Sequence, residues 1–318
     1  MILALLACTD LQRTPTRDPR ETWTAEERRE RGRVVLVTLD GLRWQDVLDA
    51  GWRSRAESQP LMPQLTMLGN DGVLIGDVRT GSRLQVEAAL PKSLPSYQGM
   101  MLGHATDCES NNCARPSDET LPERVVRELG LDEHEVAVFG TWGPIAEAAS
   151  SGRGGFTMST GYQDGDPPPW GKSRWDHQTL GATVDHLREH DTRLVWMALG
   201  DADEWAHEGE LERYLEAAKG SDTALTQLVS TLAARGVWDD TTLIVTTDHG
   251  RGLGPFWESH SRWDAARDVW LVASGPEVVR AGRVHARDDG TLSGLRPTIE
   301  HLLGLEPVGQ PFWWASGE

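Results

Sequence analysis

The stretch "RVVLVTLDG", residues 33–41, is a run of β-branched and apolar residues that ends in Asp-Gly. Similar runs follow along the chain: "EVAVFG" (135–140), "RLVWMALGD" (193–201), "TTLIVTTDHG" (241–250) and "DVWLVASGP" (268–276). A short, nearly continuous apolar run is typical of a strand that is buried on both faces of a parallel sheet. The sequence therefore predicts a central sheet, and several of its strands end in an aspartate.

Helical patterns lie between these predicted strands. Residues 121–131 are amphipathic and close on glycine, and residues 214–236 and 295–305 space their apolar residues three and four apart. Alternation of strands and helices predicts an α/β fold, a mostly parallel sheet with helices on both faces. Residues 150–175 are rich in Gly, Pro and Ser, which predicts a long surface loop.

The composition is that of an ordinary globular protein, with 38% hydrophobic and 25% charged residues among 318. The formal net charge of −18 disfavours binding of a nucleic-acid duplex, because the phosphate backbone is also negative. No boundary is evident beyond residue 33, so residues 33–318 are predicted to form a single domain.

The three cysteines give information about the cellular compartment of the protein. The opening "MILALLACTD" (1–10) resembles a lipoprotein signal, which predicts residues 1–32 to be a signal segment and tether with a lipid anchor at Cys8. The chain would then lie in a bacterial cell envelope, periplasmic or anchored, and meet the membrane only through the anchor; a ragged apolar terminus is the alternative. Cys108 and Cys113 lack a second ligand pair nearby, which favours a disulfide over a zinc site.

Acidic and imidazole side chains follow three of the predicted strands. Asp40 follows the first, "DADEWAH" (201–207) follows the third, and "DHG" ends the fourth, with one more histidine in "FWESHSRW" (256–263). Each alone is more typical of a turn or a solvated helix face. Together they would meet at one sheet edge, where ligand sites form in α/β folds. The candidate ligands are Asp40, Asp203, His207, Asp248, His249 and His260, with Asp201 as an uncertain neighbour.

Carboxylates that crowd together repel one another unless a cation neutralises them. Mixed Asp and His ligands suit Zn²⁺, with Mn²⁺ as the next choice. The set is too large for one catalytic zinc with an open position, so two divalent ions are predicted.

Ser93 lies in "PKSLPSYQGMMLGH" (91–104), two residues before Pro95, at the start of a predicted helix. A capping serine is the simple interpretation. The alternative is a nucleophile, because the N-terminus of a helix binds anions through free backbone N–H groups and a dication activates a hydroxyl. The metal-ligand candidates elsewhere in the chain favour the nucleophile, and the helix start is expected to supply N–H groups to substrate oxygens.

An ordered series of motifs gives the sequence a family resemblance. The segments are "VTLDGLRWQDV" (37–47), "MPQLTMLGNDGV" (62–73), "PKSLPSYQGMMLG" (91–103), "DADEWAH", "TTDHG", "SH" (259–260) and "LRPTIEHLLGLEP" (295–307). In this order they resemble the alkaline phosphatase superfamily, and more narrowly its nucleotide pyrophosphatase/phosphodiesterase-like branch, which is related to the sulfatases. The resemblance covers about residues 33–308 and implies an alkaline-phosphatase-like fold.

The resemblance implies a role for each candidate. Asp40, Asp248 and His249 would hold one metal ion, which also contacts Ser93. Asp203, His207 and His260 would hold the other. Ser93 would be the nucleophile of a metal-dependent hydrolase of phosphoric esters, a phosphodiesterase or phosphomonoesterase that forms a phosphoseryl intermediate on a small-molecule phosphate (or sulfate) ester.

The chain departs from the family pattern beside the nucleophile. Ser96 stands where the phosphodiesterase branch has an asparagine that binds a phosphate oxygen, so Ser96, Asn111 and Asn112 are alternative candidates for that role. Tyr97 stands where sulfatases have arginine. Candidates for a wall that contacts the substrate are Trp44, Trp170 and Trp175.

Two other functions are compatible with these residues. One is a sulfatase or phosphonate hydrolase on the same scaffold. The other is a surface-tethered binding module with a structural metal site. Structural zinc sites are closed and four-coordinate, which would leave Ser93 without a role.

Overall fold

The computed structural model describes residues 23–48, 60–162, 168–171 and 173–316. The predicted anchor Cys8 and most of the predicted segment 1–32 lie outside these residues. Within the described part of the chain, no helix combines the length and apolar character needed to cross a bilayer.

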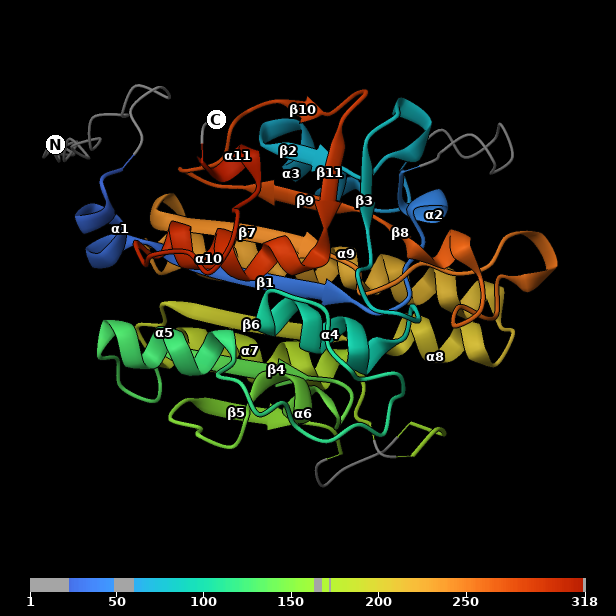
Figure 1. Ribbon diagram of the computed structural model, residues 1–318, viewed down its shortest axis with the longest axis horizontal. Coiled ribbons are helices and arrows are strands. Elements are labelled where there is room, and N and C mark those ends of the chain that lie inside the picture. Colours follow the sequence, from blue (N-terminus) through green and yellow to red (C-terminus); the bar gives the residue numbers. More distant parts are fainter. Residues whose placement is uncertain (1–22, 49–59, 163–167, 172, 317–318) are drawn as a thin grey trace, which may run out of the picture.

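A central sheet of eight strands organises the molecule (Figure 1). Its strands, in spatial order, are β10 (Gly282–Arg283), β2 (Val73–Ile75), β9 (Leu271–Ser274), β7 (Thr241–Thr246), β1 (Arg33–Leu39), β6 (Leu194–Leu199), β4 (Val136–Gly140) and β5 (Thr157–Thr160). The pairs β1–β6, β1–β7, β4–β6, β4–β5 and β10–β2 are parallel, and β9 runs antiparallel to both β7 and β2. The predicted mostly parallel sheet is therefore confirmed.

A second, three-stranded sheet lies beside this one. It consists of β11 (Asp288–Thr291), β3 (Arg83–Gln85) and β8 (Asp268–Val269). The predicted strand over 268–276 thus divides between the two sheets, with β8 in the small sheet and β9 in the large one.

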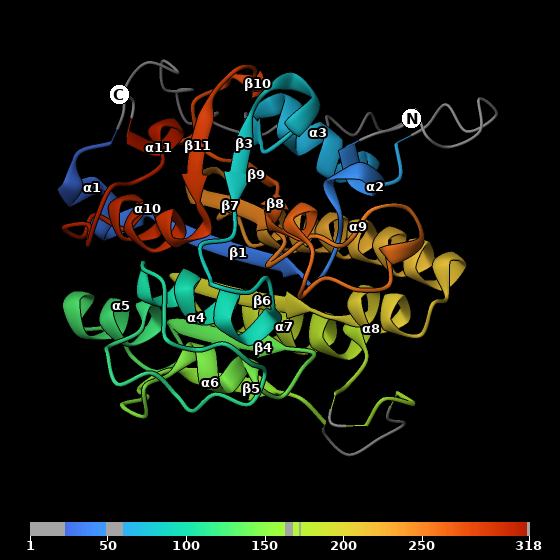
Figure 2. The same ribbon diagram turned by 45° about the vertical axis from the view of Figure 1, so that its right-hand side comes forward.

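Helices cover both faces of the large sheet (Figure 2). One face carries α4 (Ser93–Leu102), α5 (Leu121–Leu129), α6 (Ile145–Ala149), α10 (Leu295–Leu302) and α11 (Trp313–Ser316). The other carries α2 (Trp44–Leu48), α3 (Pro63–Asp71), α7 (Asp176–Glu189), α8 (Asp201–His207) and α9 (Leu211–Ala234). Alternate residues of β1 enter the two cores: Val34 and Leu36 face the first, Val35 and Val37 the second. Burial on both faces explains why the strands are continuously apolar.

Part of the predicted tether belongs to the folded body. Helix α1 (Ala25–Arg31) is docked by Glu277, which accepts hydrogen bonds from the Trp23 backbone N–H at 3.0 Å and from Arg28 Nε at 2.9 Å. The helix was missed because ion pairs, rather than an apolar stripe in its Arg- and Glu-rich sequence, attach it.

The predicted loop over 150–175 contains a strand. β5 pairs in parallel with β4 at the edge of the sheet. Its Met158 is 38% exposed, so the strand lacks the continuous burial of the central ones. The sequence analysis missed this strand because glycines flank it and its residues are only partly buried.

The pairing of β1 with β6 and β7 determines where the candidate metal ligands lie. Leu39 lies opposite Leu199, and Thr38 lies opposite Thr246. Because the three strands are parallel and in this register, the residues that follow them emerge at one edge of the sheet. Asp40, the DADEWAH helix and the DHG turn therefore converge.

Glu123 at the start of α5 makes stability depend on pH. Burial raises the pKa of its carboxyl, but hydrogen bonds from the Thr120 N–H and from the Ser151 and Ser150 hydroxyls outweigh burial and lower the pKa from 4.5 to about 2. A carboxylate with a depressed folded-state pKa stabilises the fold above its unfolded pKa, and this contribution is lost as pH falls from about 4.5 towards 2.

We therefore expect Glu123→Gln to lower the free energy of unfolding at pH 7 and the deficit to shrink at acid pH, where the native protein loses the same contribution. Urea unfolding at neutral pH and at about pH 3 measures this. Glu128→Gln, on the partly exposed end of the same helix, is the control. A Glu123→Gln deficit that is the same at both pH values would contradict the prediction.

Candidate metal centre and nucleophile

The first group of candidate ligands comes from the ends of β1 and β7. His249 Nε2 lies 3.5 Å from Asp40 Oδ1 and 3.4 Å from Asp248 Oδ2. One ligand atom from each residue lies within 4.8 Å of the other two, and all three side chains are buried. The structure thus brings together the three residues assigned to one metal ion.

The second group comes from α8 and the loop that follows β7. Asp203 and His207 stand four residues apart on one helix face, with His207 Nε2 3.1 Å from Asp203 Oδ2. His260 Nε2 lies 3.3 Å from His207 Nε2. These three residues also satisfy the 4.8 Å criterion for a shared cation.

The electrostatics of the first group fit a divalent cation. Burial, together with repulsion from Asp248 and Asp203, holds the pKa of Asp40 well above its usual value. Burial and Asp203 likewise raise the pKa of Asp248 to about 7. Asp248 Oδ2 is buried and accepts no hydrogen bond from any residue that the structure describes. A cation among these oxygens would relieve the repulsion and occupy the orphaned oxygen.

Backbone carbonyls set the tautomers of two histidines. His249 Nδ1 donates to Gly250 O at 3.0 Å, and His260 Nδ1 donates to Pro91 O at 2.6 Å. Each Nε2 therefore carries a lone pair directed at its group, the arrangement that metal-binding histidines require. Burial lowers the pKa of both rings, which keeps them neutral for ligation.

Arg251 connects the two groups, and the sequence analysis missed it. Its guanidinium binds Asp203 Oδ1 and donates to the backbone carbonyls of Asp203, Gly41 and Glu258, each at 3.0 Å. Burial raises the pKa of Asp203, but Arg251 and His207 more than offset it and hold that pKa well below the usual value. Oδ2 of Asp203 remains directed at His207. The sequence feature that could have indicated this residue is the arginine two residues after His249, in "DHGRG".

Gly41 permits this close packing. Its φ is +62°, and a Cβ atom there would collide with the side chains of Asp203 and Arg251. Glycine is therefore required at the turn after Asp40, both for the left-handed backbone and for the approach of the ion pair.

Ser93 lies beside the first group. It is the first residue of α4, and its Oγ is 3.3 Å from His249 Nε2 and 3.5 Å from Asp40 Oδ1. One turn along α4, the Tyr97 hydroxyl donates to Asp40 Oδ2 at 3.2 Å. Burial and the nearby aspartates raise the pKa of Tyr97 well above its usual value, so the hydroxyl stays a donor that orients Asp40.

The start of α4 differs from the expectation. The Leu94 N–H is bound by Asn111 Oδ1 at 3.1 Å, the Ser96 N–H by Lys92 O at 3.0 Å, and Pro95 has none. The expected row of free N–H groups is therefore largely occupied, because the loop that carries Asn111 folds over the helix start. With Oδ1 fixed by Leu94, the Asn111 amide directs its two Nδ2 hydrogens elsewhere.

The predicted disulfide is present and closes this loop. The Cα atoms of Cys108 and Cys113 are 5.7 Å apart, and Asn111 lies between the two cysteines. The cross-link limits the conformations of the loop and so holds Asn111 against α4.

Asp201 acts as a helix cap. Its carboxylate accepts the Asp176 N–H at 3.3 Å, while Asp176 accepts the N–H groups of Gly200 at 2.8 Å and Asp201 at 3.2 Å. The two aspartates thus cap the starts of α7 and α8 reciprocally. This arrangement fixes the first turn of the helix that carries Asp203.

A cavity of about 210 Å³ borders both groups. The residues that line it are Asp40, Ser93, Asn111, Thr141, Trp142, Ser173, Gly200, Asp203, Glu204 and His207. Thr141, Trp142, Ser173 and Glu204 were not predicted. The first three lie on loops whose sequences contain no ligand motif. Glu204 was overlooked because it lies between the two predicted metal ligands of α8, Asp203 and His207.

The other predicted contacts lie elsewhere. Ser96 is buried, and its Oγ has no hydrogen-bond partner among the described residues, but it does not line the cavity. Asn112 is exposed. Trp44 packs beneath the guanidinium of Arg79.

Trp170 and Trp175 pack on each other rather than on the cavity. Their ring centroids are 5.2 Å apart, and Trp205 lies 4.7 Å from Trp170. Neither Trp170 nor Trp175 lines the 210 Å³ cavity, because their faces are used in this cluster.

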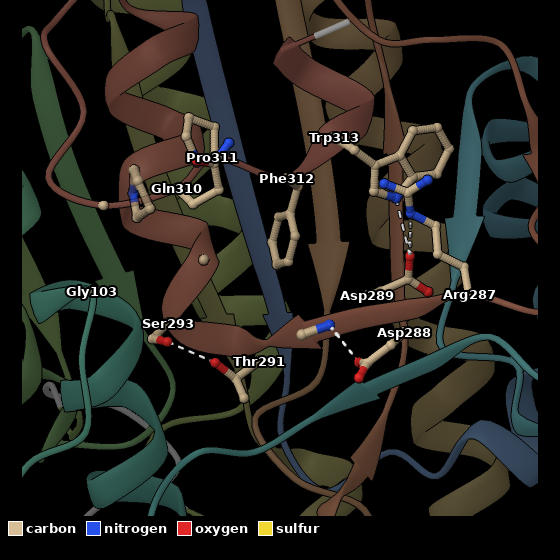
Figure 3. Close-up of a pocket in the computed structure, with 14 residues that line it drawn as sticks. Gly103, Arg287, Asp288, Asp289, Thr291, Ser293, Gln310, Pro311, Phe312 and Trp313 are labelled. Carbon is tan, nitrogen blue, oxygen red and sulfur yellow. Dashed lines mark hydrogen bonds and ion pairs between the residues drawn. The ribbon is translucent and has the colours of Figure 1, made fainter. Parts of the chain in front are cut away.

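A larger cavity, of about 480 Å³, is separate from the metal-ligand groups (Figure 3). It is lined by residues of β11, the start of α10 and the segment 309–313. Trp313 Nε1 donates to Asp289 Oδ1 at 3.0 Å, and the Arg287 guanidinium stacks on the Trp313 ring at 4.4 Å. None of the six candidate metal ligands lines this cavity, so it is not the predicted metal site.

Comparison with known sequences supports a metal-dependent family. The sequence model of the Metalloenzyme superfamily matches residues 173–307. A 2,3-bisphosphoglycerate-independent phosphoglycerate mutase from Haloarcula marismortui is 26% identical over 125 residues, 39% of this chain and 23% of that protein. The same enzyme from Synechococcus elongatus is 31% identical over 122 residues, 36% of this chain and 22% of that protein. The matches therefore span about a quarter of the length of these relatives.

Solved structures with the same fold cover most of the chain. A 2-O GAG sulfatase has a TM-score of 0.68 at 16% identity, covering 91% of this chain and 75% of that one. A phosphonate monoester hydrolase from Silicibacter pomeroyi has a TM-score of 0.61 at 17% identity, covering 90% and 77%. The lipoteichoic acid synthase LtaP from Listeria monocytogenes has a TM-score of 0.63 at 15% identity, covering 89% and 74%. The predicted alkaline-phosphatase-like fold is therefore confirmed.

The two ligand groups lead to a prediction about metal content. We expect the purified protein to hold two divalent ions per chain and His207→Ala to hold about one, because the second group loses a ligand while the first stays intact. Plasma mass spectrometry after dialysis measures this. His177→Ala, at an exposed position, is the control and should still hold two ions. Full metal content in His207→Ala would contradict the assignment of the second group.

Proposed function

We propose, on the basis of its alkaline-phosphatase-like fold and metal-ligand groups, that this chain is a metal-dependent hydrolase of phosphoric esters with Ser93 as the nucleophile. One observation carries the proposal: Ser93 Oγ lies 3.3 Å from His249 Nε2 and 3.5 Å from Asp40 Oδ1, on a cavity that the second ligand group also borders. A hydroxyl with these neighbours is placed for activation by a cation.

Asp40, Asp248 and His249 would hold one ion, and Asp203, His207 and His260 the other. The three imidazoles favour Zn²⁺, with Mn²⁺ as the alternative. Such ions, when bound, lower the pKa of a serine hydroxyl and balance the charge of the phosphoryl oxygens.

Ser93, Tyr97 and Asn111 would each have a separate role in the reaction. Ser93 Oγ forms a bond to phosphorus as the bond from phosphorus to the leaving alcohol breaks, which gives a phosphoseryl group and the free alcohol. The hydroxyl proton of Ser93 ends on the departing alcohol. A water oxygen then bonds to phosphorus as the bond from phosphorus to Ser93 Oγ breaks, which restores the Ser93 hydroxyl and releases phosphate from a monoester, or a phosphate monoester from a diester. Tyr97 keeps Asp40 oriented through its hydrogen bond. Asn111 lines the cavity and uses Oδ1 to cap Leu94, so its Nδ2 group would donate to a phosphoryl oxygen.

The lining favours phosphate esters over sulfate esters. Tyr97 occupies the position where sulfatases have arginine, and its hydroxyl is bound to Asp40. The described lining of the cavity contains no lysine or arginine that could replace that arginine. The alternative, a sulfatase or phosphonate hydrolase, requires a different nucleophile chemistry: formylglycine at position 93, found by mass spectrometry of the peptide, would favour the sulfatase.

Removal of the nucleophile tests the proposal. We expect Ser93→Ala to lower kcat/KM for para-nitrophenyl phosphate or bis-para-nitrophenyl phosphate on the order of 10³-fold or more, with unchanged metal content, because the phosphoseryl route is lost. Comparison of the two esters distinguishes monoesterase from diesterase activity. Ser230→Ala, an exposed position on α9, is the control. Full activity of Ser93→Ala would rule out the mechanism.

Asn111 and Asn112 form a matched pair for the second prediction. Asn111→Asp keeps an oxygen for the Leu94 N–H but replaces the donor with a negative charge, so kcat/KM for the ester should fall by about 100-fold, as when an oxyanion donor is lost. Asn112→Asp adds the same charge at the exposed neighbour and should change kcat/KM little. Equal losses in the two variants would show that only the charge of the loop matters.

A further inference from the structure

Arg251 is a buried cation that lies beside the ligand groups but outside the cavity. Its side chain is 1% exposed and does not line the 210 Å³ cavity, so it cannot contact a bound ester. It follows His249 by two residues and binds the carboxylate of Asp203, a member of the second ligand group. Any role of Arg251 in the proposed reaction must therefore be exerted through the residues that it holds.

Four hydrogen bonds fix the guanidinium. Nε donates to Gly41 O, Nη1 to Glu258 O and Nη2 to Asp203 O, each at 3.0 Å, and Nη2 also binds Asp203 Oδ1. These acceptors belong to the turn after β1, the loop that leads to His260 and the first turn of α8. Because the guanidinium is a planar group held at three backbone carbonyls, it determines where Asp203 Oδ1 lies.

The two carboxylate oxygens of Asp203 have different neighbours. Oδ1 is bound by Arg251, while Oδ2 lies 3.1 Å from His207 Nε2, within the second ligand group. The ion pair packs directly against Gly41, where a Cβ atom would collide with Oδ1 and with Arg251 Nη2. The carboxylate therefore has no room to turn on that side, and Oδ2 is the oxygen left for a cation.

The number of oxygens that Asp203 contributes decides what kind of zinc site the second group forms. A carboxylate binds a cation through one oxygen or through both. With one oxygen, Asp203, His207 and His260 supply three protein atoms, as in catalytic zinc sites that keep a fourth position for water or substrate. With both oxygens, the same residues would supply four atoms and leave no vacant position on a four-coordinate ion, as in a structural site.

The charges of the two groups lead to the same distinction. The first group contains two carboxylates, those of Asp40 and Asp248, whose charges match that of one divalent ion. The second group contains one carboxylate, and Arg251 already compensates its charge. An ion in the second group would therefore keep more of its positive charge, which favours binding of a negatively charged oxygen at an open position.

We propose that Arg251 is a positioning residue that confines Asp203 to coordination through Oδ2 and so keeps one position of the second ion open. This inference rests on the metal-ligand groups of the proposed function, and it gives a role to a residue that contacts neither substrate nor ion. It also separates this chain from a binding module with a structural metal site, because Arg251 prevents the closed set of ligands.

The zinc-loaded native protein provides the direct test. In a crystal structure of the holoenzyme without phosphate or sulfate, we expect Asp203 Oδ2 at about 2.0–2.2 Å from the second ion, with Oδ1 still on Arg251. A water molecule should occupy the remaining position of that ion. Coordination by both oxygens of Asp203 would overturn the proposal, whether or not any variant folds.

Arg251→Met tests the cause in solution. The substitution removes the guanidinium, so that Asp203 is free to bind the ion with both oxygens. We expect the cobalt-loaded variant to bind imidazole, a ligand for the open position, about tenfold or more weakly than the cobalt-loaded native protein, as measured by the visible cobalt spectrum. The titration is made at about pH 8, where imidazole is largely uncharged, because removal of Arg251 also changes the local charge.

Two controls assign the effect. His207→Ala, which should hold the first ion alone, gives the spectral change that does not belong to the second group. Arg193→Met is the matched variant, because Arg193 is also buried and donates to three backbone carbonyls of α1 and its C-cap, at the amino-terminal end of β6. It should bind imidazole as the native protein does. Native imidazole affinity in Arg251→Met, or loss of the second ion from Arg251→Met alone, would contradict the assigned role.

Ester hydrolysis is measured on the same preparations, so that the two proposals can fail separately. Zinc held by a single oxygen of Asp203, without hydrolysis of any phosphoric ester, would support the role of Arg251 and contradict the proposed function. Hydrolysis by a protein whose Asp203 binds through both oxygens would contradict the role of Arg251 alone. A zinc-loaded protein without an ion in the second group would overturn both.

Discussion

The buried crowding of Asp40, Asp203 and Asp248 is the constraint on which the rest of this structure depends. Parallel pairing of β1 with β6 and β7 forces the segments after these strands to one edge of the sheet. Their carboxylates then repel one another in a medium that solvates charge poorly. Divalent cations would relieve this repulsion. The protein itself contributes Arg251 and neutral histidines of fixed tautomer, and the glycine at position 41 leaves room for the Arg251–Asp203 ion pair.

The surroundings of Ser93 follow from how α4 begins. Its backbone N–H groups are largely consumed, since Asn111 caps Leu94 from a loop that a disulfide closes. In the proposed mechanism, the side-chain amide of Asn111 on this cross-linked loop would replace the helix start as the donor next to Ser93. Such a donor would be held in position before the substrate arrives, which is the condition for strong stabilisation of developing charge.

Fold alone does not separate the possible chemistries. A sulfatase, a phosphonate monoester hydrolase and a lipoteichoic acid synthase share this architecture at 15–17% identity. Differences must therefore reside in the cavity lining, where function is decided on a common scaffold. Here the lining brings Ser93 and members of both candidate ligand groups together with Glu204 and Trp142.

The sequence by itself determined the sheet core and the candidate ligands, because continuous apolar runs mark strands buried on both faces and parallel strands must end together. It also indicated the Cys108–Cys113 disulfide from the absence of other ligands. Only the tertiary structure decided that α1 and β5 belong to the body, that Arg251 binds Asp203 and that Glu204 lines the cavity. These features depend on contacts between segments far apart in the chain, and such contacts leave no periodic pattern in any one segment.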